Sequence, residues 1–154
     1  MDTIFETHLR WPANADQAKP PADNYCRDSV VGANAKADIA ASAPGGFGGD
    51  EARYNPEELM LMSLSQCHML TFLAIAARAK ISVLAYTDHA SGNLYRAPNG
   101  KMQLEKALLQ PQVTVAKGTD LGRLQVMHEK AHANCFMANS VNFPVECQAV
   151  GVEQ

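Results

Sequence analysis

The chain has 154 residues, which is enough for one domain with a single hydrophobic core, and we expect one domain over residues 1–154. Lysine and arginine total 13 against 16 aspartates and glutamates, a formal net charge of -3 that argues against a nucleic-acid partner. Hydrophobic residues make up 47%, which excludes disorder as a general description.

The N-terminal third predicts a small group of strands. Residues 4–11 predict a first strand, followed by a polar, proline-containing loop over residues 12–24. Residues 25–31 and 35–41 predict a hairpin around Gly-Ala-Asn at positions 32–34. The next segment, residues 42–54, holds four glycines without a following Gly-Lys-Ser/Thr, which indicates a mobile connector rather than a phosphate loop.

A long helix is then predicted from residue 55 to about residue 79. Asn55 is a good N-cap, Pro56 suits the first helical position, and Glu57 and Glu58 lie at the positive end of the helix dipole. The 19 residues from 59 to 77 carry no charge, a length that would span a membrane.

Polar side chains within this uncharged stretch argue against a membrane span. They are costly in lipid without partners: Ser63, Ser65, Gln66, His68 and Thr71. We therefore expect no membrane partner and a helix buried on all sides. Because a domain this small rarely surrounds a helix alone, a second subunit is expected to cover part of it.

The remaining elements complete an α+β chain. Residues 81–94 and 102–115 predict two long strands joined by a turn at Pro-Asn-Gly, positions 98–100. A second helix is predicted over residues 121–135 and a final strand over residues 145–152. Strands, helix, strands, helix and strand in this order are typical of α+β proteins rather than repeating βαβ units.

The N-terminus, MDTIFETHLRW, has no basic start and no apolar core segment, so we expect no secretory signal and a cytoplasmic location. In a reducing compartment, cysteines are core thiols, metal ligands or redox residues rather than a disulfide framework. The chain has four of them: Cys26, Cys67, Cys135 and Cys147.

One motif indicates metal chemistry. Residues 128–132 contain His-Glu-x-x-His, in which two histidines one turn apart ligate zinc and the glutamate activates water. A positive Lys130 and the short chain count against a zinc protease. A metal site from His128, His132 and Cys135, on one helix face, stays open beside a purely structural role for the histidines.

Cys67 is the second candidate for chemistry. A free cysteine in a helix is commonly an inert core thiol. A reactive one needs its thiolate stabilised by a cation or by hydrogen-bond donors. Arg27 is the candidate cation, its alternative being a solvated turn residue. Cys147 fits an inward strand position as a core thiol, and Cys26 has no assigned role.

Together these segments resemble the OsmC/Ohr family, the osmotically inducible protein C and organic hydroperoxide resistance proteins. Residues 55–59, Asn-Pro-Glu-Glu-Leu, with Cys67 ten residues beyond Glu57, are similar to the family's helix with the reactive cysteine. Residues 131–140 are similar to the segment around its second cysteine, and Arg27-Asp28 stands at the place of its loop Arg-Asp. The chain also departs from the family pattern at three places. Tyr25-Cys26 replaces the family's Gly-Gly, Phe136 replaces its proline, and Ala138 replaces its serine.

The resemblance implies antiparallel sheets wrapped around a buried central helix in an intertwined homodimer. It implies a thiol peroxidase of oxidative stress defence without a bound cofactor. Cys67 would attack a hydrophobic organic hydroperoxide, Cys135 would resolve the sulfenic acid as a disulfide, and a small dithiol, lipoyl-type in the family, would reduce it. Arg27 would stabilise the Cys67 thiolate, and Glu57 would orient Arg27.

Helix geometry adds one constraint on these roles. Ten residues of helix span ~15 Å, so Glu57 cannot serve Cys67 of its own helix directly. It must meet Cys67 of another chain or act through an intermediate such as Arg27. Two other interpretations stay open: a metal-binding protein or metal-dependent hydrolase using His128 and His132, and a non-enzymatic small-ligand-binding dimer of the same fold.

Overall fold

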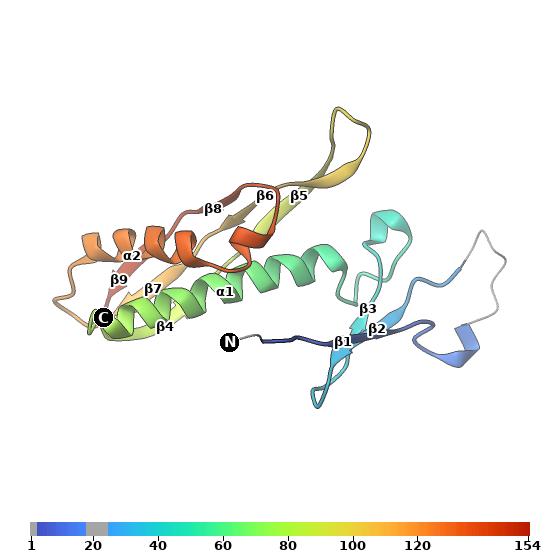
Figure 1. Cartoon of the computed structure of the whole chain (residues 1–154), viewed down its shortest axis with the longest axis horizontal. Helices are drawn as coiled ribbons and strands as arrows, with labels where there is room; N and C mark the ends of the chain where they lie inside the picture. Colours follow the sequence, from blue (N-terminus) through green and yellow to red (C-terminus); the bar gives the residue numbers. More distant parts are fainter. Residues whose placement is uncertain (1–2, 18–24) are drawn as a thin grey trace. The chain divides into compact units, whose positions relative to one another are not determined.

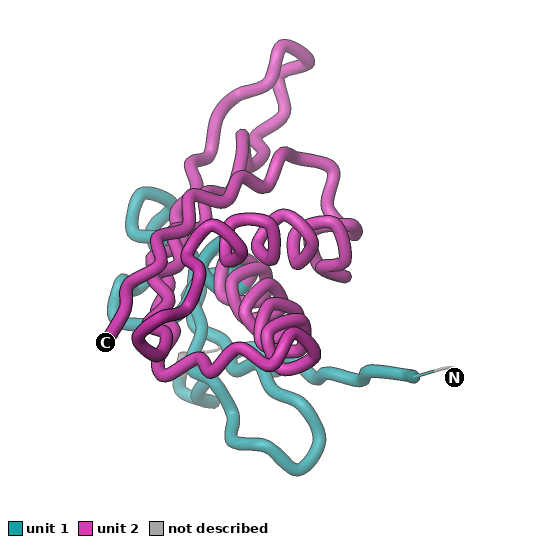
Figure 2. Tube along the Cα trace, turned by 90° about the vertical axis from the view of Figure 1, so that its left-hand side faces the viewer, with its two compact units in different colours: residues 1–59 teal, residues 60–154 magenta. Residues whose placement is uncertain are grey.

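The computed structural model describes residues 3–17 and 25–154, so residues 18–24 of the predicted loop lie outside the described residues. The chain divides into two compact units, Met1–Leu59 and Met60–Gln154, which are coloured separately in Figure 2.

Unit 1 is built on a three-stranded antiparallel sheet in the order β1-β2-β3 (Figure 1). Its strands are β1 (Thr7–Arg10), β2 (Ser29–Ala33) and β3 (Ile39–Ala41), and a short 3-10 turn (Ala15–Gln17) follows β1. The predicted strand and hairpin are confirmed, but the hairpin turn comes later than predicted. Gly32 and Ala33 still pair with β1, and only then does the chain turn, with Ala35 at φ 59.

Helix α1 (Pro56–Arg78) begins with the predicted cap. The Glu58 N–H donates to the Asn55 side-chain oxygen at 2.9 Å, and the Asn55 N–H donates to the Glu58 carboxylate at 3.1 Å. This reciprocal pair is a capping box, which satisfies two backbone donors that the helix leaves free. At the other end of α1, Lys80 adopts the left-handed conformation with a φ of 56. The Ile81 N–H then donates a hydrogen bond to the Ala76 carbonyl of the last helical turn.

In unit 2, the two predicted long strands and the predicted final strand over residues 145–152 are each divided in two, so the prediction of continuous strands was wrong. The strands are β4 (Val83–Thr87), β5 (Ser91–Arg96), β6 (Met102–Leu109), β7 (Gln112–Val115), β8 (Val145–Cys147) and β9 (Val150–Glu153). They form two sheets, β4-β7-β9 and β5-β6-β8. The last strand of each sheet runs parallel to its neighbour, so both sheets are mixed rather than antiparallel throughout.

Side-chain hydrogen bonding explains where the strands break. The Asp88 carboxylate, between β4 and β5, accepts the Gln110 N–H at 2.7 Å and also the Ser65 hydroxyl from α1. Pro111 follows Gln110 and has no N–H to contribute to a ladder. A pattern of alternating apolar residues does not reveal such a bend, because the apolar pattern continues through it.

Helix α2 (Leu121–Asn134) confirms the predicted second helix, and the Asp120 side chain caps it by accepting the Gly122 N–H at 2.9 Å. Both helices pack on the sheets through two apolar clusters of buried residues. One joins α1, β7 and α2: Phe72, Ala76, Val113, Val115, Leu124, Met127 and Ala131. The other joins α1 to β6: Leu64, Ala107 and Leu109.

Within the chain, α1 is buried on one face only. Its buried residues recur every four positions: Leu64, His68, Phe72 and Ala76. On the opposite side Met62 and Leu70 stay 47% and 56% exposed. By length and hydropathy α1 would pass as a membrane span, as core helices also do. Its buried face packs against the rest of unit 2, which identifies it as a packed helix with one uncovered side.

We predict that Asn55→Ala lowers the free energy of unfolding by about 1 kcal/mol, because the Glu58 N–H loses its acceptor. Asn55→Asp keeps a side-chain acceptor and should stay near the wild-type value. Urea unfolding followed by circular dichroism measures both. Equal destabilisation by the two substitutions would show that the cap contributes nothing.

Candidate functional site

The structure brings the two predicted redox cysteines together. Cys67 lies on α1 and is partly buried, whereas Cys135 follows the last residue of α2 and is only 1% exposed. Both are free thiols, and Cys67 lies close enough to Cys135 to raise the pKa of the Cys135 thiol. Two neighbouring thiols are the arrangement from which a disulfide forms on oxidation.

The surroundings of the two sulfurs differ. Burial raises the pKa of the Cys135 thiol, and its contact with Cys67 adds to this. The Ala138 N–H, which donates to the Cys135 sulfur at 3.5 Å, opposes the shift. Cys135 is therefore a protonated, water-excluded thiol at neutral pH, whereas Cys67 is only partly buried.

In unit 1, the predicted Arg27 packs among residues of its own segment. Its guanidinium donates to the Tyr25 carbonyl at 3.1 Å and lies 4.6 Å from the centre of the Tyr25 ring. A Cβ at Gly48 would lie 3.1 Å from the Arg27 Cζ, and Gly48 has a φ of 77. The segment predicted as a mobile connector therefore includes a position where glycine allows backbone to approach the arginine.

The other polar groups of this region are Asp28 and Glu57. Asp28 accepts the Ser42 hydroxyl at 3.0 Å and pairs with Arg53 at 3.4 Å. One carboxylate oxygen of Glu57 is buried and has no hydrogen-bond partner among the described residues. The expected roles of Arg27 and Glu57 toward Cys67 stay predictions.

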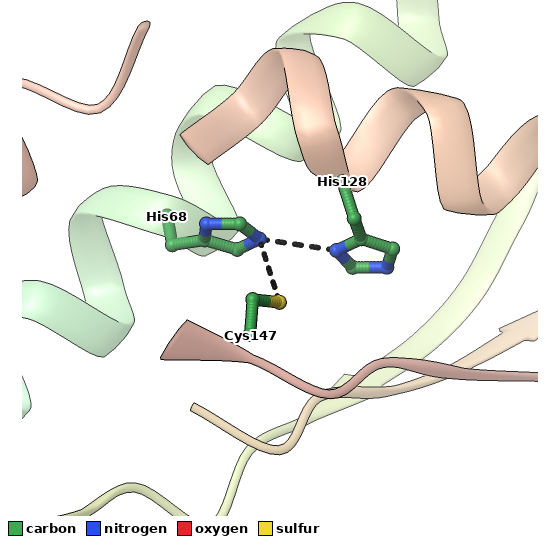
Figure 3. A group of neighbouring side chains, drawn as sticks. All are labelled: His68, His128 and Cys147. Atoms are coloured by element: carbon green, nitrogen blue, oxygen red, sulfur yellow. Dashed lines mark hydrogen bonds between the residues drawn. The ribbon is translucent and has the colours of Figure 1, made fainter. Parts of the chain in front are cut away.

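A second cluster lies inside unit 2, where His68 of α1, His128 of α2 and Cys147 of β8 point toward one another (Figure 3). A hydrogen bond of 3.0 Å joins His68 Nε2 to His128 Nδ1, and the Cys147 sulfur lies 3.7 Å from His68 Nε2. The two imidazoles are 0% and 3% exposed. Neither His68 nor Cys147 was predicted to accompany His128.

Burial controls the protonation of this cluster. It lowers the pKa of His128 to about 4, with a further contribution from His68. It also lowers the pKa of His68, where His132 acts in the same direction and Asp88 opposes. Burial and Asp88 raise the pKa of Cys147 to about 11. At neutral pH the three groups are therefore uncharged.

The structure places the members of the His-Glu-x-x-His motif in different surroundings. His128 faces His68 and Cys147, whereas His132 and Cys135 are not part of this group of potential ligands. A cavity of about 210 Å³ borders the motif, lined by Gln125, His128, Glu129, His132, Val145 and Cys147. The sequence did contain a signal that His68 is buried, because it lies four residues from both Leu64 and Phe72 on one face of α1. The signal was hard to recognise, because nearly all residues of this uncharged stretch are apolar and no single face stands out.

The chain belongs to the OsmC-like family, whose model matches residues 48–149. It is similar in structure to an OsmC-like protein of unknown function from Vibrio cholerae, with 32% identity, a TM-score of 0.84 and coverage of 97% of this chain and 100% of that one. The mixed helix-and-sheet architecture is therefore that of the OsmC-like fold, as the sequence predicted. A search of the curated proteins finds no match to the sequence.

Two more distant structures share the fold. One is an organic hydroperoxide resistance protein from Elizabethkingia anophelis, with 21% identity, a TM-score of 0.70 and full coverage of both chains, 100% of each. The other is an organic hydroperoxide resistance protein OsmC from Legionella pneumophila, with 17% identity, a TM-score of 0.72 and coverage of 97% and 96%.

We predict that Cys135 is alkylated by iodoacetamide at least about tenfold more slowly than Cys26 at pH 8, because Cys135 is buried and its pKa is raised. Since only the thiolate reacts, its rate should rise by up to about tenfold per pH unit until its pKa is reached. Quantitative peptide mass spectrometry measures both rates. A Cys135 rate that is already constant above pH 8 would contradict the raised pKa.

Proposed function

We propose that this protein reduces organic hydroperoxides, with Cys67 as the attacking thiol and Cys135 as the resolving thiol. The observation that carries the proposal is that the two thiols are neighbours that interact with one another, one of them partly accessible and the other buried. Membership of the OsmC-like family supports a peroxiredoxin-like role, and two structures with the same fold are named organic hydroperoxide resistance proteins.

The reaction balances in three steps. The Cys67 thiolate attacks the O–O bond of the hydroperoxide, which with one proton yields an alcohol and a Cys67 sulfenic acid. The Cys135 sulfur then attacks the Cys67 sulfur, forming a disulfide and releasing water. Finally a small dithiol of the lipoyl type exchanges with this disulfide, restoring two thiols while its own sulfurs become a disulfide.

Activation of Cys67 needs a cation or hydrogen-bond donors, and any cation must come from outside the stretch Leu59 to Ala77 of its own helix, which carries no charge. In this proposal Arg27 stabilises the thiolate and Glu57 orients Arg27. One carboxylate oxygen of Glu57 is buried and finds no partner within the part of the chain that the structure describes, which supports a role as acceptor for a guanidinium. Because ~15 Å of helix separates Glu57 from Cys67, the carboxylate acts through Arg27 or on another chain.

The uncovered side of α1 supports a homodimer. Met62 and Leu70 are large, apolar and about half exposed on a helix whose opposite face is fully packed. A second copy of α1 against this side would remove both from water, which is the ordinary reason for an apolar surface on a helix. Apolar side chains along the helix would also favour a hydrophobic peroxide over a polar one.

We predict that Cys67→Ser lowers cumene hydroperoxide turnover with a lipoyl-type dithiol by at least about a thousandfold, because no other residue supplies the attacking sulfur. Cys135→Ser should consume about one equivalent of peroxide per chain rapidly and then slow, leaving a Cys67 sulfenic acid that dimedone traps. Peroxide consumption and peptide mass spectrometry measure these outcomes.

Cys26→Ser is the matched control for these variants and should keep wild-type turnover. Peroxide-treated wild-type protein should contain a Cys67–Cys135 bridge. Unchanged turnover in Cys67→Ser, or a bridge that joins a different pair of cysteines, would overturn the proposal.

We predict that Leu70→Lys weakens the dimer, because it places a charge on the uncovered side of α1. Light scattering coupled to size exclusion should show a shift from dimer to monomer or at least about a tenfold rise in the dimer dissociation constant. Leu84→Lys is the matched control, since Leu84 on β4 is also 56% exposed, and should leave the mass unchanged. A wild-type chain that runs as a monomer would refute the homodimer.

A further inference from the structure

We infer that unit 2 contains a binding site for one zinc-type transition-metal ion, ligated by His68 Nε2, His128 Nδ1 and Cys147 Sγ. The three donor atoms lie within 4.8 Å of one another, and they come from three elements, α1, α2 and β8 (Figure 3). The inference does not depend on the proposed peroxidase function, which uses other residues.

The separations of the donor atoms suit a tetrahedral ion. Zn–N and Zn–S bond lengths in proteins imply tetrahedral edges of about 3.4 Å between two nitrogens and about 3.6 Å between a nitrogen and a sulfur. The structure has 3.0 Å between the two imidazole nitrogens and 3.7 Å between His68 Nε2 and the Cys147 sulfur. The third pair, His128 Nδ1 and the Cys147 sulfur, lies within 4.8 Å, so on binding this edge closes toward about 3.6 Å and the two imidazoles turn from one another toward the ion.

The identity of the donors selects the class of metal. Two imidazole nitrogens and one thiolate are ligands that zinc and cobalt accept, whereas calcium and magnesium prefer oxygen donors. Cys147 loses its proton on binding, and each imidazole keeps one proton on the ring nitrogen that faces away from the ion. The ion thus replaces the hydrogen bond that joins His68 to His128.

An entrance and a fourth ligand position are also available. Of the three ligands, His128 and Cys147 line the cavity of about 210 Å³, together with Glu129 and His132. His132 Nδ1 is buried without a hydrogen-bond partner among the described residues. A water in the cavity would complete the tetrahedron, as in zinc sites with three protein ligands.

Occupancy would join three parts of unit 2 that are distant in the sequence. The ion would link α1, α2 and β8 through one residue of each, where the protein otherwise has the hydrogen bond between two imidazoles. An ion that binds only the folded chain raises its stability by mass action. We therefore assign the site a structural role, separate from the Cys67–Cys135 pair.

The test uses the full chain with Cys67→Ser and Cys135→Ser, so that the redox pair cannot supply thiolates to a metal. After treatment with a chelator, this protein is titrated with Co²⁺ and then with Zn²⁺. We expect one Co²⁺ per chain, visible bands of a tetrahedral ion and a near-ultraviolet thiolate-to-cobalt band. Zn²⁺ should remove these bands and raise the melting temperature.

Adding Cys147→Ser should abolish the thiolate-to-cobalt band and weaken binding more than about a hundredfold, since loss of an outer partner alone costs 10- to 100-fold. His128→Gln should weaken binding to the same extent while the fold, checked by circular dichroism, is kept. His132→Ala is the matched control and should retain the thiolate-to-cobalt band.

Three outcomes would overturn the inference. One is that no Co²⁺ or Zn²⁺ stays bound to the parent protein after desalting. Another is a thiolate-to-cobalt band that survives Cys147→Ser. The third is loss of binding in His132→Ala with full binding in Cys147→Ser, which would assign the metal to the His-Glu-x-x-His pair instead.

Discussion

The buried face of α1 is the surface on which the sheets and α2 of unit 2 pack. Leu64 is fully buried against β6, and Phe72 is fully buried among residues of β7 and α2. Burying a side chain of this size contributes about 1.5–3 kcal/mol to the stability of the fold. His68 lies between them on the same face and is equally buried. A polar side chain at that position must find polar partners inside the protein, and the structure supplies them to His68 from α2 and β8.

Neighbouring residues on α1 consequently serve different groups. Successive residues differ by about 100° around a helix, so Cys67 and His68 point in different directions. Cys67 contacts Cys135 just beyond the end of α2, and His68 contacts His128 in its middle. The thiol pair is suited to redox chemistry, while the imidazole pair with Cys147 forms a compact set of potential ligands. The close packing of α1 on α2 creates both.

Much of this was predictable from local signals. The capping box of Asn55 and Glu58 depends on residues three positions apart, so the sequence predicted where α1 begins. The order of helices and strands also followed from local patterns, and the family resemblance singled out Cys67 and Cys135, which the structure places close together. The bend at Asp88 was missed, because it depends on a hydrogen bond to Gln110, 22 residues further along the chain. The group of potential ligands formed by His68, His128 and Cys147 was also missed, because its members lie far apart in the sequence and meet only in the folded chain.

The sequence by itself therefore determined the class of fold, the start of α1 and the family to which the chain belongs. These follow from residue types at short spacing, where helix periodicity and capping act. Only the tertiary structure decided that His128 faces His68 and Cys147 rather than acting with His132. The physical reason is that packing of buried side chains between elements sets which distant residues meet, and spacing along one helix does not contain that information.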